Sequence, residues 1–477
     1  MITTLADLLP LMPLLITTAT TIVAMIVIGI RRNYAVTAGI TIAGLLIASL
    51  VAVSMISTTN SQVTPLLIVD QYSLFFTVLI CVTAMLITIF SFPYLANLDD
   101  SKEEYYLLLS IATIGAIVMV SSNHFVSTIL GLETLSMSLY GMVAYPVHSK
   151  LADKFPLEAS VKYLVLSAAA SGILLFGMAL IYAQTGTLEF SSIVNVTKET
   201  PGLGTGFAIV ALIMVFIGIA FKLSLAPFHM WTPDVYEGSP LPATTYLATI
   251  GKSAMFVVLL RFIVTTEALS FDSIILVISL VAIVSILAGN LLALLQNSLK
   301  RILAYSSIAH MGYLLIALVA SYYVQGAISV EAVTFYLFAY MVMSIGAFGV
   351  ISIVSSSEKE FDDIDDYQGL FWRNPWLALV FTGMLLSLAG IPLTVGFIGK
   401  FYLFFAGVEA GLWTLLVVLI LGSGIGLYYY LRVVYRMLLS PKGGERFKSG
   451  GSQYMGAHGV LAFVLALLLI LGVYPTP

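Results

Sequence analysis

Charged residues are scarce in this sequence: they make up 9% of its 477 residues, while hydrophobic residues make up 60%. A soluble globular domain carries about 25% charged residues, so this composition excludes an ordinary water-soluble fold. The formal net charge of -4 gives no indication of nucleic-acid binding, which needs a basic surface. We therefore expect lipid to be the solvent for most of this chain.

Cysteine is almost absent, since Cys81 is the only one. A single cysteine excludes a disulfide framework, an iron–sulfur cluster held by this chain and a zinc site made of thiolates. A removable signal peptide is also not indicated, because Asp7 and no basic residue precede the first apolar run and no small-residue cleavage site follows it. We expect that first run to stay in the mature protein.

Long apolar runs recur from one end of the chain to the other. A helix needs about 20 apolar residues to cross a hydrocarbon core of about 30 Å, and a membrane barrel would instead show alternating segments of about 10 residues. The sequence predicts an all-α membrane protein with about fourteen transmembrane helices. The predicted spans lie near residues 10–30, 35–55, 71–95, 105–121, 124–147, 158–184, 206–229, 241–264, 272–295, 302–320, 330–355, 375–405, 411–438 and 456–474.

The basic residues between the predicted spans indicate an orientation, because cytoplasmic loops retain Lys and Arg. Only Lys198 and Arg261 lie on the side reached after even-numbered spans. The loops after odd-numbered spans hold thirteen of the twenty basic residues, namely Arg31, Arg32, Lys102, Lys150, Lys154, Lys300, Arg301, Lys359, Arg373, Arg436, Lys442, Arg446 and Lys448. The sequence thus predicts that both termini face the periplasm of a bacterial inner membrane.

Five basic residues and one acid have no loop to lie in. The basic residues are Lys162, Lys222, Lys252, Lys400 and Arg432, and the acid is Glu133. The remaining acids, including the run from Glu358 to Asp366, fit a solvated loop or the ends of spans. A charged side chain at the centre of a span opposes insertion by roughly 2.5–3.5 kcal/mol, which favours a functional role. The alternative is that such a residue only reaches a lipid headgroup or satisfies a helix end, and it is favoured for Lys162 and for Arg432, which lies close to the cytoplasmic edge.

Glu133 and Lys222 form a natural pair in this interpretation. A buried carboxylate is stable as an anion only beside a cation, and a buried lysine tends to lose its proton unless an acid holds it. A closed pair would keep Lys222 charged, and an open pair would release its proton toward Lys252 and Lys400. We therefore predict a proton-transfer switch, with Lys252 and Lys400 as the next acceptors.

Proline and glycine interrupt two of the predicted spans where lysines occur. The seventh span contains Lys222-Leu-Ser-Leu-Ala-Pro227, and the twelfth contains Gly390-Ile-Pro392 before Lys400. Irregular backbone at membrane depth is tolerated only where it is buried in protein or lines a wet cavity. Broken helices in corresponding halves of a chain indicate a transport site.

An internal repeat relates these residues. Glu133, Lys222 and Lys252 are followed by His310, Lys400 and Arg432 at offsets of 177, 178 and 180 residues. An odd number of spans separates each pair, which predicts that spans four to eight and nine to thirteen are inverted repeats. The expected segments are 1–104, 105–264 for the first repeat, 265–440 for the second, and 441–477.

Two histidines and a tyrosine complete the candidates. His310 follows Tyr305 in a polar stretch of a span and titrates near neutral pH, which suits a proton relay, although a lone histidine in a span is often only a structural hydrogen-bonding group. His229, near the cytoplasmic end of its span, is a candidate uptake group. Haem ligation by these histidines has no supporting motif. Glycine-rich segments at 202–206 and 422–426 follow no strand, so they do not indicate a nucleotide site.

Several stretches resemble a known family of membrane proteins. Residues 221–240, 305–313 and 388–401, together with the motif Glu158-Ala-Ser-Val-Lys162-Tyr163, closely resemble the antiporter-like membrane subunits of bacterial type I NADH:quinone oxidoreductase, respiratory complex I. The likeness covers nearly the whole chain and its combined motifs are highly specific. Lys400, where M-type subunits have glutamate, and an end at Pro477, where L-type subunits continue into a long helix, favour the N type.

The resemblance implies an antiporter-like fold with proton transfer along a hydrated axis in the middle of the membrane. It assigns the acid of the family's ion pair to Glu133, its partner lysine to Lys222, the central lysine to Lys252 and the terminal lysine to Lys400. Neighbours would be an M-type subunit, small subunits such as the K type, and lipid. NADH, flavin, iron–sulfur clusters and quinone would belong to other subunits, with no cofactor or metal in this chain. The alternative is a subunit of a cation/proton antiporter or of a membrane hydrogenase.

Overall fold

The computed structural model describes residues 5–57, 61–96, 102–145, 155–193, 205–324, 328–355, 360–441 and 454–474. Lys150, Lys154, Lys198, Lys359, Lys442, Arg446 and Lys448 of the charge count, and Glu358, lie outside these residues. Helices dominate the described part of the chain. The helices up to the first break are η1 (Leu5–Leu11), α1 (Met12–Ile30), α2 (Tyr34–Met55), α3 (Gln71–Leu95), α4 (Glu103–Val120), α5 (Phe125–Ala144), α6 (Pro156–Thr185) and α8 (Thr205–Lys222).

The second part of the chain continues the helical pattern. Its helices are α9 (Trp231–Gly238), α10 (Leu241–Tyr246), the π-helical turn η3 (Leu247–Gly251), α11 (Lys252–Thr266), η4 (Ala268–Ser270), α12 (Asp272–Leu294), α13 (Leu299–Tyr323), α14 (Ile328–Val354), η5 (Ile364–Tyr367), α15 (Leu370–Arg373), α16 (Pro375–Ala389), α17 (Val395–Glu409), α18 (Trp413–Leu438) and α19 (Met455–Val473). Two short antiparallel strands, β1 (Ser61–Gln62) and β2 (Ile68–Val69), precede α3.

The prediction of an all-α membrane protein is confirmed. Within the described residues, twelve helices are long and apolar enough to cross a bilayer, and each coincides with one predicted span. The other two predicted spans, 206–229 and 375–405, hold the shorter apolar helices α8 and α16. The total of fourteen spans, the inverted repeat and the four segment boundaries stay predictions.

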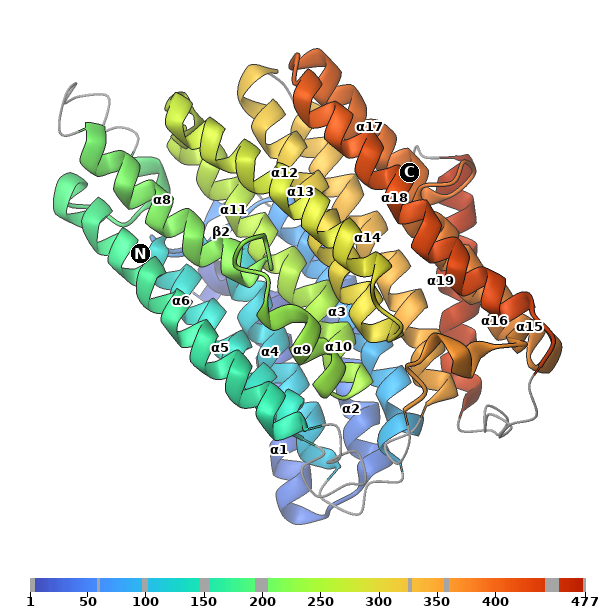
Figure 1. Cartoon of the computed structure of the whole chain (residues 1–477). Coiled ribbons are helices and arrows are strands. Elements are labelled where there is room, and N and C mark those ends of the chain that lie inside the picture. Colours follow the sequence, from blue (N-terminus) through green and yellow to red (C-terminus); the bar gives the residue numbers. More distant parts are fainter. Residues whose placement is uncertain are drawn as a thin grey trace.

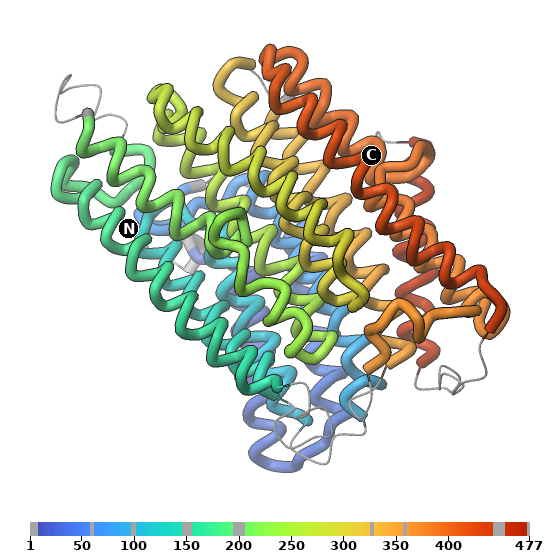
Figure 2. The backbone as a smooth tube through the Cα atoms, viewed as in Figure 1, coloured from blue at the N-terminus to red at the C-terminus, as the bar shows by residue number. Residues whose placement is uncertain are grey.

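The long helices run side by side as a tilted bundle, with α5, α6 and α8 along one edge and α16–α19 along the opposite edge (Figures 1 and 2). The apolar segment of α13 is fully buried and that of α14 is 94% buried, whereas that of α1 is 17% buried. The bundle therefore has an interior of its own, distinct from the surface that lipid or other chains would cover. The interior is where α13 and α14 lie.

Glycine and capping residues explain the local geometry. A Cβ at Gly131 of α5 would lie 2.8 Å from the carbonyl oxygen of Gly115 in α4, so only glycine permits this crossing. Helix starts are capped by side chains: Asp70 accepts a hydrogen bond from the amide of Ser73 at 2.7 Å, and Asn374 from that of Leu377 at 3.3 Å. These contacts fix where α3 and α16 begin.

Several residues assigned to loops by the charge count lie in helices or are buried, among them Arg373 in α15 and Arg436 in the last turn of α18. Lys300 and Arg301 belong to the first turn of α13, and Arg261 lies within α11, where it forms a bidentate ion pair with Asp70 at 2.7 and 3.0 Å. Glu360 was expected in a solvated loop, but its side chain is 1% exposed and bonded to Lys300. The charge count missed these pairs because it places a residue only by its distance from an apolar run. A charged side chain near a helix end can still be buried when it forms an ion pair.

Candidate functional site

Three lysines and a histidine lie buried inside the helix bundle. The exposed fractions are 7% for Lys222, 1% for Lys252, 8% for Lys400 and 2% for His310. They come from α8, α11, α17 and α13. A cation in hydrocarbon is unfavourable by several kcal/mol unless polar groups surround it, so the partners of each residue decide what it can do.

Lys222 is the last residue of α8 and bonds to hydroxyl groups of two other helices. Its Nζ donates to Ser136 Oγ of α5 at 2.9 Å and to Ser167 Oγ of α6 at 2.5 Å. Tyr140 Oη also donates to Ser167 Oγ, at 2.6 Å. A hydroxyl can donate or accept, so this lysine is surrounded by groups that can serve both of its protonation states.

Glu133 lies on α5, near these serines. It precedes Ser136 by about one turn of α5, is half-buried, and accepts a hydrogen bond from Ser171 Oγ of α6 at 2.7 Å. The predicted direct ion pair between Glu133 and Lys222 is not formed among the described contacts, because the carboxylate bonds to Ser171 and the ammonium group to Ser136 and Ser167. Each of the two side chains is thus bonded to serines of α5 and α6.

The chain after Lys222 leaves the helix, as the proline there predicts. Pro227 lies in the non-helical segment between α8 and α9, where Ser224 has a positive φ of 62°. Backbone groups freed by the break are satisfied within the protein: the carbonyl of Phe221 accepts from the indole of Trp231 at 3.0 Å, and the amide of Ala226 donates to Ser285 Oγ at 2.9 Å. This fulfils the condition for irregular backbone at membrane depth.

Lys252 follows the π-helical turn of η3 and contacts the other half of the chain. Its Nζ donates to Ser307 Oγ of α13 at 2.5 Å and lies 5.6 Å from the ring centre of Tyr236. Ser307 also accepts from Tyr340 Oη of α14 at 2.7 Å. A π-helical turn often accompanies a functional side chain, and here it sets the position of Lys252 opposite Ser307.

His310 lies one turn after Ser307 on α13, among tyrosine hydroxyls. Its Nδ1 is 2.7 Å from Tyr336 Oη, and its Nε2 is 3.4 Å from Tyr430 Oη. Tyr430 in turn bonds to Ser306. Each ring nitrogen faces a group that can donate or accept, which is the environment that a proton relay through histidine requires.

Lys400 is held differently, by the end of a helix. Its Nζ donates to the carbonyl oxygens of Leu388 and Ala389 at 3.0 and 2.8 Å, and to Ser423 Oγ of α18 at 2.9 Å. It also lies 5.4 Å from the ring centre of Tyr313. The two carbonyls are the open C-terminal end of α16, where the helix dipole favours a cation.

The second break therefore places a lysine against the helix that it follows. α16 ends at Ala389, Gly390 adopts a left-handed φ of 87°, and Pro392 lies in the five-residue corner before α17. A Cβ at Gly390 would lie 2.9 Å from the side chain of Lys400, so the missing side chain makes room for the lysine. The corner and the lysine form one unit.

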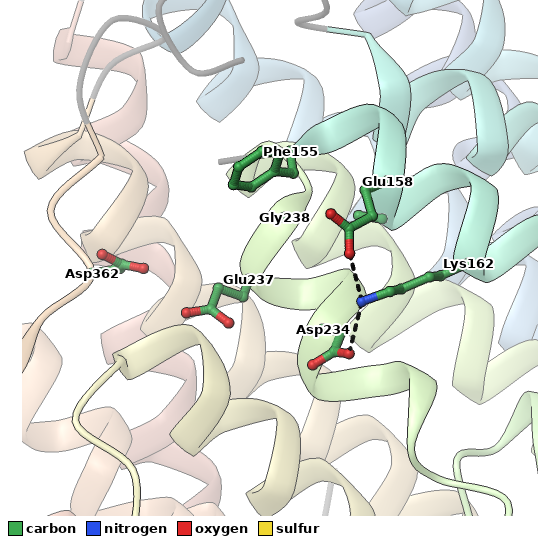
Figure 3. A pocket seen from close by; sticks show the side chains of 8 residues that line it. Phe155, Glu158, Lys162, Asp234, Glu237, Gly238 and Asp362 are labelled. Carbon is green, nitrogen blue, oxygen red and sulfur yellow. Dashed lines mark hydrogen bonds and ion pairs between the residues drawn. The ribbon is translucent and has the colours of Figure 1, made fainter. Parts of the chain in front are cut away.

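Lys162 does not belong to the buried row. Its side chain is 45% exposed and forms ion pairs with Glu158 at 2.8 Å and with Asp234 at 3.3 Å. Figure 3 shows this group at a cavity of about 390 Å³, with Glu237 and Asp362 on the other side of the opening. Lys162 lies in the second turn of α6, within the candidate span Pro156–Thr185 as expected, but its side chain reaches the acidic groups of the cavity and not the interior of the bundle.

The other secondary candidates are dispersed. His229 is 8% exposed and, within the described residues, neither of its ring nitrogens has a hydrogen-bond partner. Tyr305 is buried on α13 where α12 comes close, since a Cβ at Gly289 would lie 2.7 Å from the Tyr305 carbonyl oxygen. Arg432 donates to the carbonyls of Leu294 and Gln296, so it caps the end of α12. Its place indicates a structural role.

The matching family model decides the family of this chain. Residues 122–426, which include every lysine of the buried row, match the model described as NADH:quinone oxidoreductase/Mrp antiporter, transmembrane region. The chain belongs to this antiporter-like family. A curated relative is the NADH-quinone oxidoreductase subunit N of Methylococcus capsulatus (strain ATCC 33009 / NCIMB 11132 / Bath), which is 45% identical over 467 residues, or 98% of this chain and 93% of the relative.

Solved structures of antiporter-like proteins share the fold. A chain of respiratory complex I from Thermus thermophilus with bound aureothin matches with a TM-score of 0.81 at 32% identity, over 97% of each chain. A chain of the Mrp complex from Dietzia sp. DQ12-45-1b matches with a TM-score of 0.81 at 19% identity, over 99% of this chain and 95% of the other. The second likeness shows the fold alone.

Sequence reasoning missed the polar partners of the buried row. They are Ser136, Ser167, Ser171, Ser307, Tyr336, Tyr340, Tyr430 and Ser423. One signal was available, since Ser136 follows Glu133 by about one turn and Ser307 precedes His310 by about one turn. Serine alone is a weak signal, because in a membrane helix it often bonds to the carbonyl four residues before it.

Proposed function

We propose that this antiporter-like chain is the subunit N of a bacterial NADH:quinone oxidoreductase and moves protons across the inner membrane. The observation that carries the proposal is the row of Lys222, Lys252, His310 and Lys400, all buried among membrane-spanning helices and all bonded to polar groups of other helices. Its family and the curated relative named subunit N support the same reading. Redox chemistry takes place in other subunits, and this chain needs no cofactor or metal.

Proton transfer begins at Lys222 in this proposal. The described arrangement, with Glu133 on Ser171 and Lys222 on two other serines, corresponds to the open state of the pair. Closure would bring the carboxylate to the ammonium group and hold its proton, and opening would favour transfer. A change that arrives from a neighbouring subunit and moves α5 or α6 therefore sets the charge of Lys222.

The proton then passes along the row. It moves through water from Lys222 to Lys252, which faces Ser307, then by way of His310 and its tyrosine hydroxyls toward Lys400, which releases a proton outward. Moving one charge against about 150 mV needs roughly 3.5 kcal/mol. Opening a buried ion pair involves energies of that size.

We place the carboxylate-lined cavity of Figure 3 on the cytoplasmic side and both termini on the periplasmic side. The excess of basic residues in the loops of that side supports this orientation. Uptake would run from the cavity past His229 to Lys222. Neighbours are an M-type subunit, small subunits such as the K type, and lipid, and the exposed side chains of Leu130 and Met137 beside Glu133 offer a face for such contacts.

Replacing Lys222 by alanine in the reconstituted complex tests the proposal. Quinone reduction and proton uptake into vesicles are followed together, and the number of protons moved per electron is expected to fall. Because Lys222 contacts only hydroxyl groups, its loss leaves no backbone group unpaired, and assembly is expected to persist. An undiminished number of protons per electron rejects the role.

A cation/proton antiporter subunit or a membrane hydrogenase subunit is the competing function, since the Mrp complex has the same fold. Gentle detergent extraction separates the two. Co-purification with a soluble arm that oxidises NADH supports the proposal, whereas sodium exchange by a complex lacking that arm supports the antiporter.

A further inference from the structure

A second charged group is buried in this chain, away from the lysine row. Lys300 Nζ and Glu360 Oε2 are 2.6 Å apart, and the two side chains are 0% and 1% exposed. The pair joins the first turn of α13 to the segment before η5. Two charges are removed from water at a high desolvation cost, which an ion pair in isolation often does not offset.

The pair occupies the corner between α9 and α10. Lys300 also donates to the carbonyls of Glu237 and Ser239, at 3.0 and 2.7 Å, where α9 ends. Glu360 Oε1 accepts from the amide of Leu241 at 3.2 Å, where the continuous helical stretch to Thr266 begins. The cation thus meets the carbonyl end of one helix and the carboxylate meets the amide end of the next, which is the favourable arrangement for both dipoles.

Three parts of the chain meet at this ion pair. Tyr94 of α3 donates its hydroxyl to Glu360 Oε1, the α9–α10 corner lies in the predicted first repeat, and Lys300 lies in the predicted second repeat. Arg301, the next residue of α13, adds partly exposed ion pairs with Glu237 at 2.7 Å and Asp234 at 3.0 Å, whereas the bonds of Lys300 are buried. Moving α13 along its axis would break all of the hydrogen bonds of Lys300 together.

The corner and the lysine row share the same two helices. Ser307 lies seven residues, or about two turns, beyond Lys300 on the same face of α13. Lys252 lies eleven residues, or about three turns, beyond Leu241 in the stretch that starts at the corner. The contact of Lys252 Nζ with Ser307 Oγ at 2.5 Å therefore depends on the register that the corner sets between these helices.

We propose that the Lys300–Glu360 ion pair is a positioning device that holds α13 in register with the α10–α11 stretch, so that Ser307 stays bonded to Lys252. This inference rests on the proposed function, because it gives the pair a part in proton transfer from Lys252. Lys300 and Glu360 exchange no proton in the reaction. They act through the position of Ser307.

The double variant Lys300→Met/Glu360→Met separates positioning from stability. Replacing both members of a buried ion pair by apolar residues is often neutral or stabilising, because no unpaired charge remains. A pair that only stabilises the fold would then be dispensable for proton transfer. A pair that sets the register would not be, because methionine cannot bond to the carbonyls of Glu237 and Ser239.

The experiment measures protons moved per electron in the complete complex reconstituted in vesicles, normalised to the amount of assembled complex. We expect the double variant to assemble and to show a lower ratio. An assembled double variant with the wild-type ratio overturns the inference. Should the double variant fail to assemble, Lys300→Met/Glu360→Gln gives the same decision, because it also removes the donor to Glu237 and Ser239 while it keeps an acceptor for Leu241.

Two further variants make the result specific. Arg436→Gln removes an exposed ion pair with Asp365, 3.5 Å long, that ties the same connecting segment to α18, and its ratio is expected to equal the wild-type ratio. Lys252→Met distinguishes a failure of the proposed function from a failure of the positioning role. A wild-type ratio in Lys252→Met rejects the proposed function, whereas a lowered ratio there with a wild-type ratio in the double variant rejects only the positioning role.

Discussion

The two broken helices hold their lysines with different kinds of partner. Lys222, at the end of α8, bonds only to the hydroxyls of Ser136 and Ser167. Lys400, after the corner that follows α16, bonds to the carbonyls of Leu388 and Ala389 as well as to a hydroxyl. The two lysines occupy corresponding positions in the predicted repeat, yet one faces side chains and the other faces the end of a helix.

This difference separates the roles of the two lysines. Hydroxyl groups can donate or accept, so the partners of Lys222 suit both the charged and the neutral amine. Carbonyl groups only accept, and together with the dipole of α16 they favour the charged form of Lys400. The partners of Lys222 thus serve either protonation state, whereas the two carbonyls beside Lys400 serve only as acceptors.

The largest expected effect is on stability and distinguishes the two breaks. Lys400→Met leaves the carbonyl of Leu388 without a donor, which costs about 1–3 kcal/mol. The carbonyl of Ala389 keeps Ser423 Oγ as a donor at 3.2 Å. Lys222→Met leaves only hydroxyls, which can turn to the carbonyls of their own helices. Thermal unfolding of the purified complexes is expected to place the midpoint of Lys400→Met clearly below that of Lys222→Met. Equal midpoints would contradict the comparison.

The sequence predicted the buried lysines but not how they are held. Lys222, Lys252 and Lys400 were recognisable because each interrupts an apolar run far from any loop. Their partners are serines, tyrosines and backbone carbonyls, which occur throughout membrane helices and become informative only once the helices are packed. Glu360 was misplaced for the opposite reason: it belongs to an acidic loop by sequence, and only the fold shows Lys300 beside it.

The ion pair of Asp70 and Arg261 lies at the end of a span, in contrast to the lysines inside the bundle. Its charge therefore responds to the pH of the solution outside the bilayer. Burial would raise the pKa of Asp70, but the hydrogen bonds and charge of Arg261 outweigh it and lower the pKa below its ordinary value. The stabilisation is thus fully present above the unfolded pKa of about 3.9 and is lost as pH falls through the lower folded value. Between these limits wild type is expected to lose more stability than Arg261→Gln.

Thermal unfolding of both proteins as a function of pH measures this difference. The two stability curves are expected to converge as the pH falls, because protonated Asp70 no longer attracts Arg261 in the wild type. Parallel curves over the whole acidic range would show that Arg261 does not lower the pKa of Asp70.

A smaller effect is expected from the hydroxyl groups themselves. The double variant Ser136→Ala/Ser167→Ala removes both partners of Lys222, at about 1 kcal/mol for each hydrogen bond, and is expected to slow proton translocation. Ser423→Ala is the matched control, because Lys400 keeps its two carbonyl partners. Initial rates of vesicle acidification per assembled complex measure both. A larger loss in Ser423→Ala than in the double variant would reverse the assignment of roles.

The smallest effect is expected at Lys162. This lysine is half-exposed and its ion pairs with Glu158 and Asp234 lie at the surface of the cavity, where such pairs contribute about 0–1 kcal/mol. Lys162→Ala is expected to change neither the unfolding midpoint nor the number of protons moved per electron by a measurable amount. A loss as large as that of Lys222→Ala would return Lys162 to the buried row.

The central claim is that ionisable side chains in the middle of the membrane exchange protons through water and hydroxyl groups. A structure of the assembled complex at a resolution that shows ordered water tests it most directly. The account predicts a connected series of waters and hydroxyls from Lys222 past Lys252 and His310 to Lys400. A dry apolar barrier between these lysines, in every state of the working complex, would contradict it.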